Sequence, residues 1–216
     1  MGFFGNLFGG KDEEGDKRVL LDHPSKLRTG DILKIGFVDQ PDISNKNLEV
    51  LEVNTYDFEG KNDYSLTLKS ETGDSFWLSV TKDDGEEYIN ISKKLSRGNV
   101  KKLFNPDEFA KIFEEGHIDE LLRVGCPEGF EEWTAESYYE EEDCSKGYFH
   151  RGDYRDKENP IYEDESTSLD YYLLEDEEGD FAIEIEVYEG GETEVYSCVY
   201  LPLSVISEMW PGEGKV

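Results

Sequence analysis

Residues 63–80 read DYSLTLKSETGDSFWLSV, and residues 170–187 read DYYLLEDEEGDFAIEIEV. Each stretch contains an alternating run of apolar and polar residues, an acidic turn with a glycine, and a second alternating run. This alternation, bounded by turn residues, is typical of a β-hairpin. Each copy continues through another acidic glycine turn into a further strand-like run, at residues 88–91 and 195–200. The pattern predicts two related copies of one hairpin unit, an internal duplication.

From this repeat we expect a mainly β (α+β) fold, built as a β-sandwich of two related antiparallel β modules. An intervening helix and a short C-terminal helix complete the predicted architecture. We divide the chain into a Phe-rich segment with an acidic tether at residues 1–17, a first β module at 18–125 with a helix near 105–115, and a second, strongly acidic β module at 126–216.

Two local signals carry the helix predictions. Asn105 followed by Pro106 is typical of a helix N-terminus, because asparagine caps the first free N–H groups and proline fits the first helical position. The run PLSVISEM at residues 202–209 predicts the short helix near the end of the chain.

The charge of the chain is extreme and uneven. The sequence holds 52 Asp and Glu against 22 Lys and Arg, which gives a net charge of −30. Residues 127–200 contain 25 of the acidic residues and only 4 of the basic ones. Such a surface repels phosphates and anionic lipids and favours cationic partners, so we expect no direct binding of nucleic acid. The alternative interpretation is that the acidity only keeps a tyrosine-rich protein in solution.

The N-terminal segment is a candidate partner-binding element. If it forms a helix, Phe3, Phe4, Leu7 and Phe8 lie on one apolar face. These four residues are predicted to dock into a partner groove or at a membrane interface. The alternative is that they pack on their own domain or stay disordered.

A second candidate surface lies on the hairpin of residues 181–200. Alternate residues of a strand point to opposite faces, so the aliphatic residues of 181–187 face one way and the acids the other. If the aliphatic face is core, the outer face is a carboxylate strip edged by tyrosines, which suits nucleic-acid mimicry or capture of a polyamine or basic peptide. A pocket joining these carboxylates and tyrosines would instead favour binding of a small cation. The candidate binding residues of this strip are Glu184, Glu186, Tyr188, Glu192 and Glu194.

Catalytic, metal and cofactor signatures are absent from the sequence. Neither an EF-hand loop nor a zinc spacing occurs, and no nucleophile elbow or phosphate-binding loop is present. Three unevenly spaced cysteines, Cys126, Cys144 and Cys198, favour a reducing cytoplasm over a disulfide scaffold. No apolar run approaches the length of a membrane span. We therefore expect no catalytic site, metal or cofactor, although enzyme activity is left open.

The order of these parts resembles the YjfK-type bacterial family of unknown function, encoded beside phage-shock-protein-A-like genes. The resemblance is carried by a Phe-rich start at residues 3–9, the hairpin at 64–80, the run at 171–174 and the closing LPLS at 201–204. It implies a cytoplasmic accessory factor in a membrane-associated system and assigns no catalytic residue.

Three functions follow from the sequence as hypotheses. The first is a non-enzymatic cytoplasmic adaptor that binds a cationic or membrane-associated protein, with its N-terminal segment as the contact at the membrane periphery. The second is an acidic inhibitor that mimics nucleic acid and blocks a DNA-binding protein. The third is a protein that binds a polyamine or another small cation.

Overall fold

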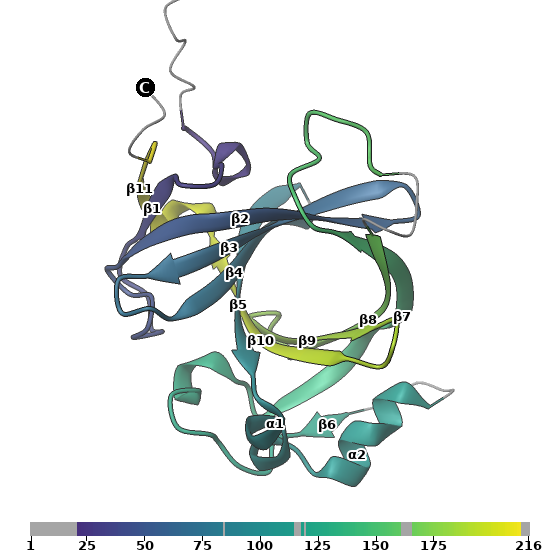
Figure 1. Cartoon of the computed structure of the whole chain (residues 1–216). Coiled ribbons are helices and arrows are strands. Elements are labelled where there is room, and N and C mark those ends of the chain that lie inside the picture. The colour runs from purple at the N-terminus through teal and green to yellow at the C-terminus, as the bar shows by residue number, and fades with distance from the viewer. Residues whose placement is uncertain (1–20, 84, 115–117, 119, 161–165, 213–216) are drawn as a thin grey trace, which may run out of the picture.

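The chain folds around a closed antiparallel β-barrel. The structure, a computed structural model, describes residues 21–83, 85–114, 118, 120–160 and 166–212. Eight strands form the barrel in the order β2-β3-β4-β5-β10-β9-β8-β7, and a pairing between β2 and β7 closes it. Figure 1 looks along the barrel, with both halves of the ring in view. The predicted β-sandwich of two modules is therefore wrong.

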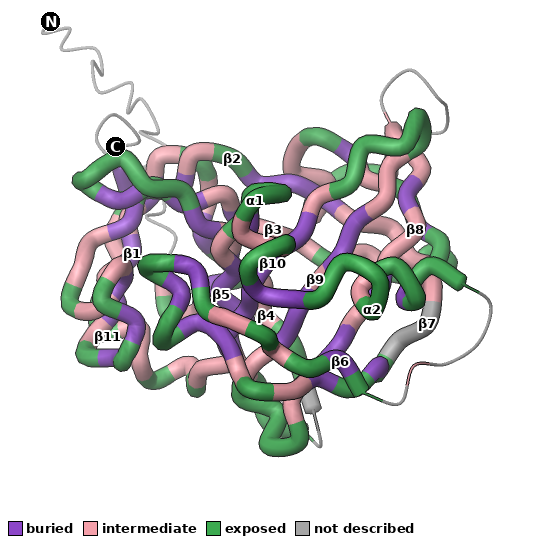
Figure 2. Tube along the Cα trace, turned by 90° about the horizontal axis from the view of Figure 1, so that it is seen from below, coloured by how far each residue is buried: buried purple, intermediate pink, exposed green. Residues whose placement is uncertain are grey.

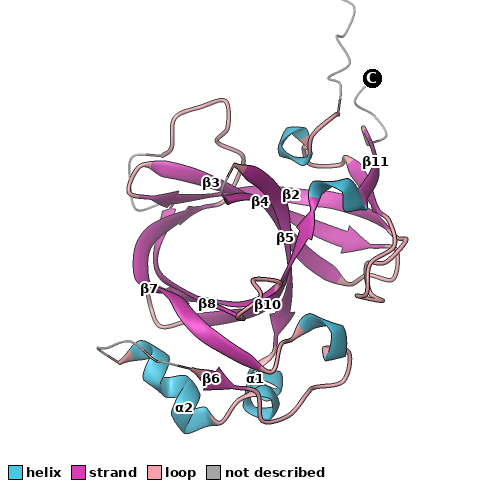
Figure 3. Ribbon diagram, turned by 180° about the vertical axis from the view of Figure 1, so that it is seen from behind, coloured by secondary structure: helices cyan, strands magenta, loops and turns pink. Residues whose placement is uncertain are grey.

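The barrel carries short additions at both ends of its sheet. β11 and β1 extend the sheet beyond β2, and β6 pairs with β7 on the other side. In Figure 3 the helical segments all lie outside the ring of strands. The strands are β1 Ile32–Ile35, β2 Asn47–Phe58, β3 Lys61–Ser70, β4 Ser75–Asp83, β5 Glu86–Leu95, β6 Leu121–Leu122, β7 Ser137–His150, β8 Ser166–Glu175, β9 Phe181–Tyr188, β10 Thr193–Pro202 and β11 Ile206–Trp210, and the α-helices are α1 Arg97–Leu103 and α2 Pro106–Ala110.

The two repeated hairpins occupy equivalent places in the ring. The hairpin β3–β4 lies between β2 and β5, and the hairpin β8–β9 lies between β7 and β10. The two four-stranded halves meet along β5–β10 and along β2–β7. Each half supplies one side of a shared barrel, so the repeat builds one closed sheet in place of two separate modules.

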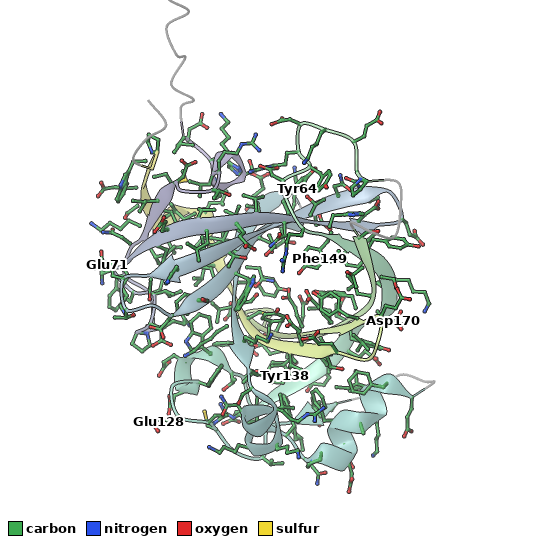
Figure 4. The ribbon with its side chains drawn as sticks, in the orientation of Figure 1. Tyr64, Glu71, Glu128, Tyr138, Phe149 and Asp170 are labelled. Atoms are coloured by element: carbon green, nitrogen blue, oxygen red, sulfur yellow. The ribbon has the colours of Figure 1, made fainter. Side chains whose placement is uncertain are left out.

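The main apolar core lies outside the barrel wall. Ile183 and Ile185 of β9 are fully buried in one cluster with Phe104 and Trp133, which belong to the segments that cover the barrel from outside, and with Tyr138 at the start of β7. Figure 2 shows α1, α2 and β6 lying across the strands on this side, and Figure 4 shows Tyr138 below the barrel wall. Burying an aliphatic side chain of this size stabilises the fold by about 1.5–3 kcal/mol. This outer layer therefore fixes the apolar face of each strand outward and leaves the opposite face for the lumen.

The helix predictions have different outcomes. The helix after Asn105 is confirmed as α2, where the Asn105 side chain accepts hydrogen bonds from the N–H groups of Asp107 and Glu108. Of the helix predicted at residues 202–209, only Leu203–Val205 is helical, as a single 3-10 turn; the rest is wrong, because residues 206–210 form β11, which pairs with β1. Pairing with an open sheet edge outweighed the weak local preference for a helix. None of the described helices has the length and apolar character needed to span a membrane.

The seam between β2 and β7 is the narrowest join in the barrel. Only three residue pairs define it, from Thr55↔His150 to Asp57↔Tyr148. The chain that leaves β7 then bonds back to β2: Thr55 Oγ1 donates to the carbonyl of Gly152 at 3.0 Å, and the Tyr154 N–H donates to Thr55 Oγ1 at 3.2 Å. These hydrogen bonds fasten the last strand contact of the ring.

Gly147 tests how tightly this seam is packed. A Cβ at this position would lie 2.6 Å from two carbons of the Phe58 ring and 3.0 Å from the carbonyl oxygen of Asp57. We expect Gly147→Ala to lower the free energy of unfolding by about 1–3 kcal/mol, because overpacking forces the ring and the β2 backbone to move. Urea denaturation followed by circular dichroism measures the change.

Gly98 offers the matched control for that substitution. It lies in α1, with nothing closer to an added Cβ than Ser96 Oγ at 3.7 Å. Gly98→Ala should be neutral or slightly stabilising, because alanine favours a helix over glycine. Equal stability of Gly147→Ala and the wild type would contradict a tightly packed seam.

Candidate ligand-binding cavity in the barrel

The lumen of the barrel is a polar and aromatic cavity. Its volume is about 570 Å³, within the range of small-molecule sites. Eight-stranded barrels have an interior that side chains can fill or that can hold one small ligand. Figure 4 shows Phe149 pointing into the ring, where it contacts Tyr56 and Tyr188 edge to face. The aromatic residues lining the cavity are Tyr56, Phe58, Tyr64, Trp77, Tyr171, Tyr196 and Tyr200.

Strand alternation explains how acidic residues reach the inside. On β9, Ile183 and Ile185 point into the outer core, so Glu184 and Glu186 point into the lumen. The alternation expected from the sequence is therefore confirmed. The side is reversed, however: the carboxylate face that we expected on the outer surface lines the cavity, and Glu186 is only 5% exposed.

Glu184 is held by neutral donors from β5. Asn90 Nδ2 donates to Glu184 Oε1 at 2.6 Å, and Ser92 Oγ donates to Glu184 Oε2 at 3.3 Å. Burial raises the pKa of Glu184, and hydrogen bonds from Cys198, Asn90, Ser92 and Tyr171 only partly offset that rise. The carboxyl group is thus positioned without a cation beside it.

Glu186 lies one step further along β9 and is also bound by neutral groups. The Tyr188 hydroxyl donates to Glu186 Oε2, and Tyr56 supplies a second hydrogen bond. Burial raises the pKa of Glu186 to about 7, with a further contribution from the negative charge of Glu184. Near neutral pH this group exchanges a proton readily, which an exposed glutamate would not do.

Aromatic rings and hydroxyls complete the walls. Trp77 and Tyr196 meet edge to face with ring centres 5.0 Å apart, and Phe58 contacts Tyr171 at 5.6 Å. The Tyr200 hydroxyl donates to Glu175 Oε1 at 2.6 Å. Burial raises the pKa of Tyr196 and of Tyr200 well above the usual range for tyrosine, so both hydroxyls stay neutral donors. Aromatic faces next to carboxylates form a surface that attracts organic cations.

The remaining charged groups near the lumen are accounted for individually. Glu194 lies opposite Glu186 in the β9–β10 pair and binds Lys94 Nζ and the Tyr196 hydroxyl. Asp63 and Lys82, which also line the cavity, are both exposed, so water screens them. Within the described part of the chain, no lysine, arginine or histidine forms an ion pair with Glu184 or Glu186.

The structure brings together part of the predicted partner-binding set. Glu184 and Glu186 line the cavity, Tyr188 donates a hydrogen bond to Glu186, and Glu194 lies opposite Glu186 on β10. Glu192 is exposed at the turn between β9 and β10 and takes no part in the cavity. The other predicted binding residues, Phe3, Phe4, Leu7 and Phe8, lie outside the described residues.

Sequence reasoning missed the half of the cavity that comes from the first repeat. Asn90 and Ser92 of β5, Trp77 of β4 and Tyr56 of β2 were not selected. A signal was present in residues 88–92, YINIS, where polar residues alternate with two isoleucines that are fully buried outside the barrel. Without the pairing of β5 with β10, nothing placed these polar residues beside Glu184.

The described residues give little support for a metal site or for a reactive cysteine. No group of three or more His, Cys, Asp or Glu side chains is arranged there to hold a metal ion. The three cysteines are free, and the buried Cys198 has its pKa raised by burial, which disfavours the reactive thiolate.

Comparison with known proteins adds no relative. No protein-family model matches the chain, and no curated protein or solved structure matches it either. The resemblance to the YjfK-type family stays a prediction, and the function has to be argued from the cavity.

The raised pKa of Glu186 predicts how stability depends on pH. The folded protein binds this proton more tightly than the unfolded chain, whose glutamate has a pKa near 4.5. Stability from this group is therefore present below about pH 4.5 and is lost as the pH rises through about 7, by roughly 3 kcal/mol at most. We expect the free energy of unfolding to fall between about pH 5 and pH 8, and Glu186→Gln to reduce that fall, as measured by urea denaturation.

The exposed Glu192 provides the control. Glu192→Gln removes the same charge from the same hairpin and should leave the pH dependence unchanged. A profile that is identical in the wild type and in Glu186→Gln would show that Glu186 ionises as freely in the folded protein as in the unfolded chain.

Proposed function

We propose that this protein is a non-enzymatic binding protein that takes a small organic cation, an amine, into the barrel. One observation carries the proposal: two buried carboxyl groups face an aromatic-lined cavity and have only neutral hydrogen-bond partners among the described residues. A buried charge without a counter-charge is costly. An ammonium group would supply the missing charge and the hydrogen-bond donors at once.

The rest of the cavity supports the same class of ligand. The Trp77 and Tyr196 rings offer aromatic faces to an alkylammonium group, an attraction of about 0.5–2 kcal/mol depending on desolvation. Carboxylate oxygens accept the N–H bonds of an ammonium group and offer nothing to an anion. The negative potential of a chain with a net charge of −30 also attracts cations toward the barrel.

The two other hypotheses from the sequence stay predictions, each for a different reason. Nucleic-acid mimicry relied on an exposed carboxylate strip, and Glu184 and Glu186 are turned into the lumen. The adaptor hypothesis relied on Phe3, Phe4, Leu7 and Phe8, which lie outside the described residues. Only the small-cation hypothesis gains support from a built cavity.

Binding of butylamine and of its neutral analogue butanol tests the proposal. We expect the fluorescence of Trp77 to change when butylamine is added and to stay unchanged with butanol, because only the amine can pair with the buried carboxyl groups. The double variant Glu184→Gln, Glu186→Gln should lose binding by at least about tenfold. Calorimetry on the same samples gives the affinities.

A matched double variant removes two acids from the same hairpin outside the cavity. Glu189 and Glu192 are both exposed, so Glu189→Gln, Glu192→Gln should bind butylamine as the wild type does. Equal binding of butanol and butylamine, or equal losses in the two double variants, would contradict an amine site in the lumen.

A further inference from the structure

We propose that the ligand of this cavity is a dication, such as an alkyl diamine, with one ammonium group for Glu184 and one for Glu186. This inference rests on the amine-binding function proposed above and specifies the charge and the shape of the ligand. It follows from the charge balance of the lumen and from the separate ways in which the two carboxyl groups are held.

The charge balance leaves two carboxylates to be neutralised. Of the four charged residues that line the cavity, Asp63 and Lys82 are exposed and opposite in sign, so they offset one another. Glu194 near the lumen already has Lys94. Glu184, which is half-buried, and Glu186, which is buried, remain. When both are ionised, neutrality inside the barrel requires a ligand with two positive charges.

The two carboxyl groups are directed to different parts of the lumen. Glu184 is bound by Asn90 and Ser92 of β5, whereas Glu186 is bound by Tyr188 and by Tyr56 of β2. Residues two apart on a strand are separated by roughly 6.6–6.8 Å. Each carboxyl group can therefore take an ammonium group of its own while it keeps these partners. Two ammonium groups on a short flexible chain can pair with both carboxyl groups.

A monocation would leave an energetic problem that a dication removes. With one ammonium group bound, the second carboxyl group must either stay ionised in a poorly solvated lumen or hold a proton. Among the described residues, the titratable groups that act on Glu186 are acids or neutral phenols: Glu184 and Glu194 are acids, and Tyr56, Tyr188 and Tyr196 are phenols. A second ammonium group therefore replaces the proton and stabilises both charges.

The cavity has room for more than the simplest diamine. Its volume of about 570 Å³ is typical of sites for drug-sized molecules. Aromatic rings line the walls of the cavity, so the chain that joins the two ammonium groups would contact apolar surface. Putrescine is the smallest probe with the required charge, and butylamine is the matched probe with one charge.

Calorimetric titration of putrescine and butylamine at about pH 8 tests the inference. We expect putrescine to bind the wild type at least about tenfold more tightly than butylamine, since a second charge-assisted contact contributes at least that much. Glu184→Gln and Glu186→Gln should each bring putrescine down to about the affinity of butylamine. Glu192→Gln, which removes one exposed charge, should keep the preference for putrescine.

Each outcome decides one of the two proposals. If both amines bind the wild type equally, the dication inference is overturned and amine binding stands. If putrescine is preferred to the same degree in Glu184→Gln and Glu186→Gln, the preference comes from the overall charge of the protein, and the inference is again overturned. If neither amine binds, the amine-binding function itself fails. Thermal unfolding of each variant confirms that glutamine leaves the barrel folded.

Discussion

Closure of the barrel between β2 and β7 is the constraint on which the rest of the structure depends. β2 is twelve residues long and pairs with three strands: one edge pairs with β3, while on the other edge its first part pairs with β1 and its last part pairs with β7. Three residue pairs complete the ring. Closure separates the two faces of every strand, because one side faces the lumen and the other must be covered from outside. The glycine at position 147 and the hydrogen bonds of Thr55 allow this approach.

The placement of the apolar core outside the barrel explains why the lumen can be functional. Phe104 and Trp133 cover the strands with β6, α1 and α2, and stability is drawn from that layer. The side chains in the lumen therefore do not have to form the apolar core. Polar groups can occupy the lumen even though their burial costs free energy. Two carboxyl groups with raised pKa are a feature more typical of a functional site than of a structural one.

The sequence predicted the strands and their alternation well, and it predicted their assembly poorly. The faces of β9 were assigned correctly, but a period of two residues does not say which face is turned toward a lumen. The offset of the repeat was correct for β4 and β9, where the outward-facing Phe76 and Leu78 align with Ile183 and Ile185, but it was one residue off for β3 and β8. Aligning Asp63 with Asp170 spaces the copies by 107 residues, whereas the outward-facing pairs Leu66 with Tyr172 and Leu68 with Leu174 are 106 apart. A shift of one residue in a strand exchanges its two faces. Local sequence patterns do not show which distant strands pair, so pairings such as β5–β10 and β1–β11 could not be predicted.

The central claim is that two carboxyl groups inside the barrel form a binding site for a cation. Carbon-13 NMR of the glutamate carboxyl groups, followed through a pH titration with and without putrescine, tests it most directly. Assignment comes from the spectra of Glu184→Gln and Glu186→Gln. The account predicts that both carbons titrate above the exposed glutamates in the empty protein, and that putrescine shifts both titrations to lower pH. Two carboxyl groups that titrate with the exposed glutamates and do not respond to putrescine would contradict it.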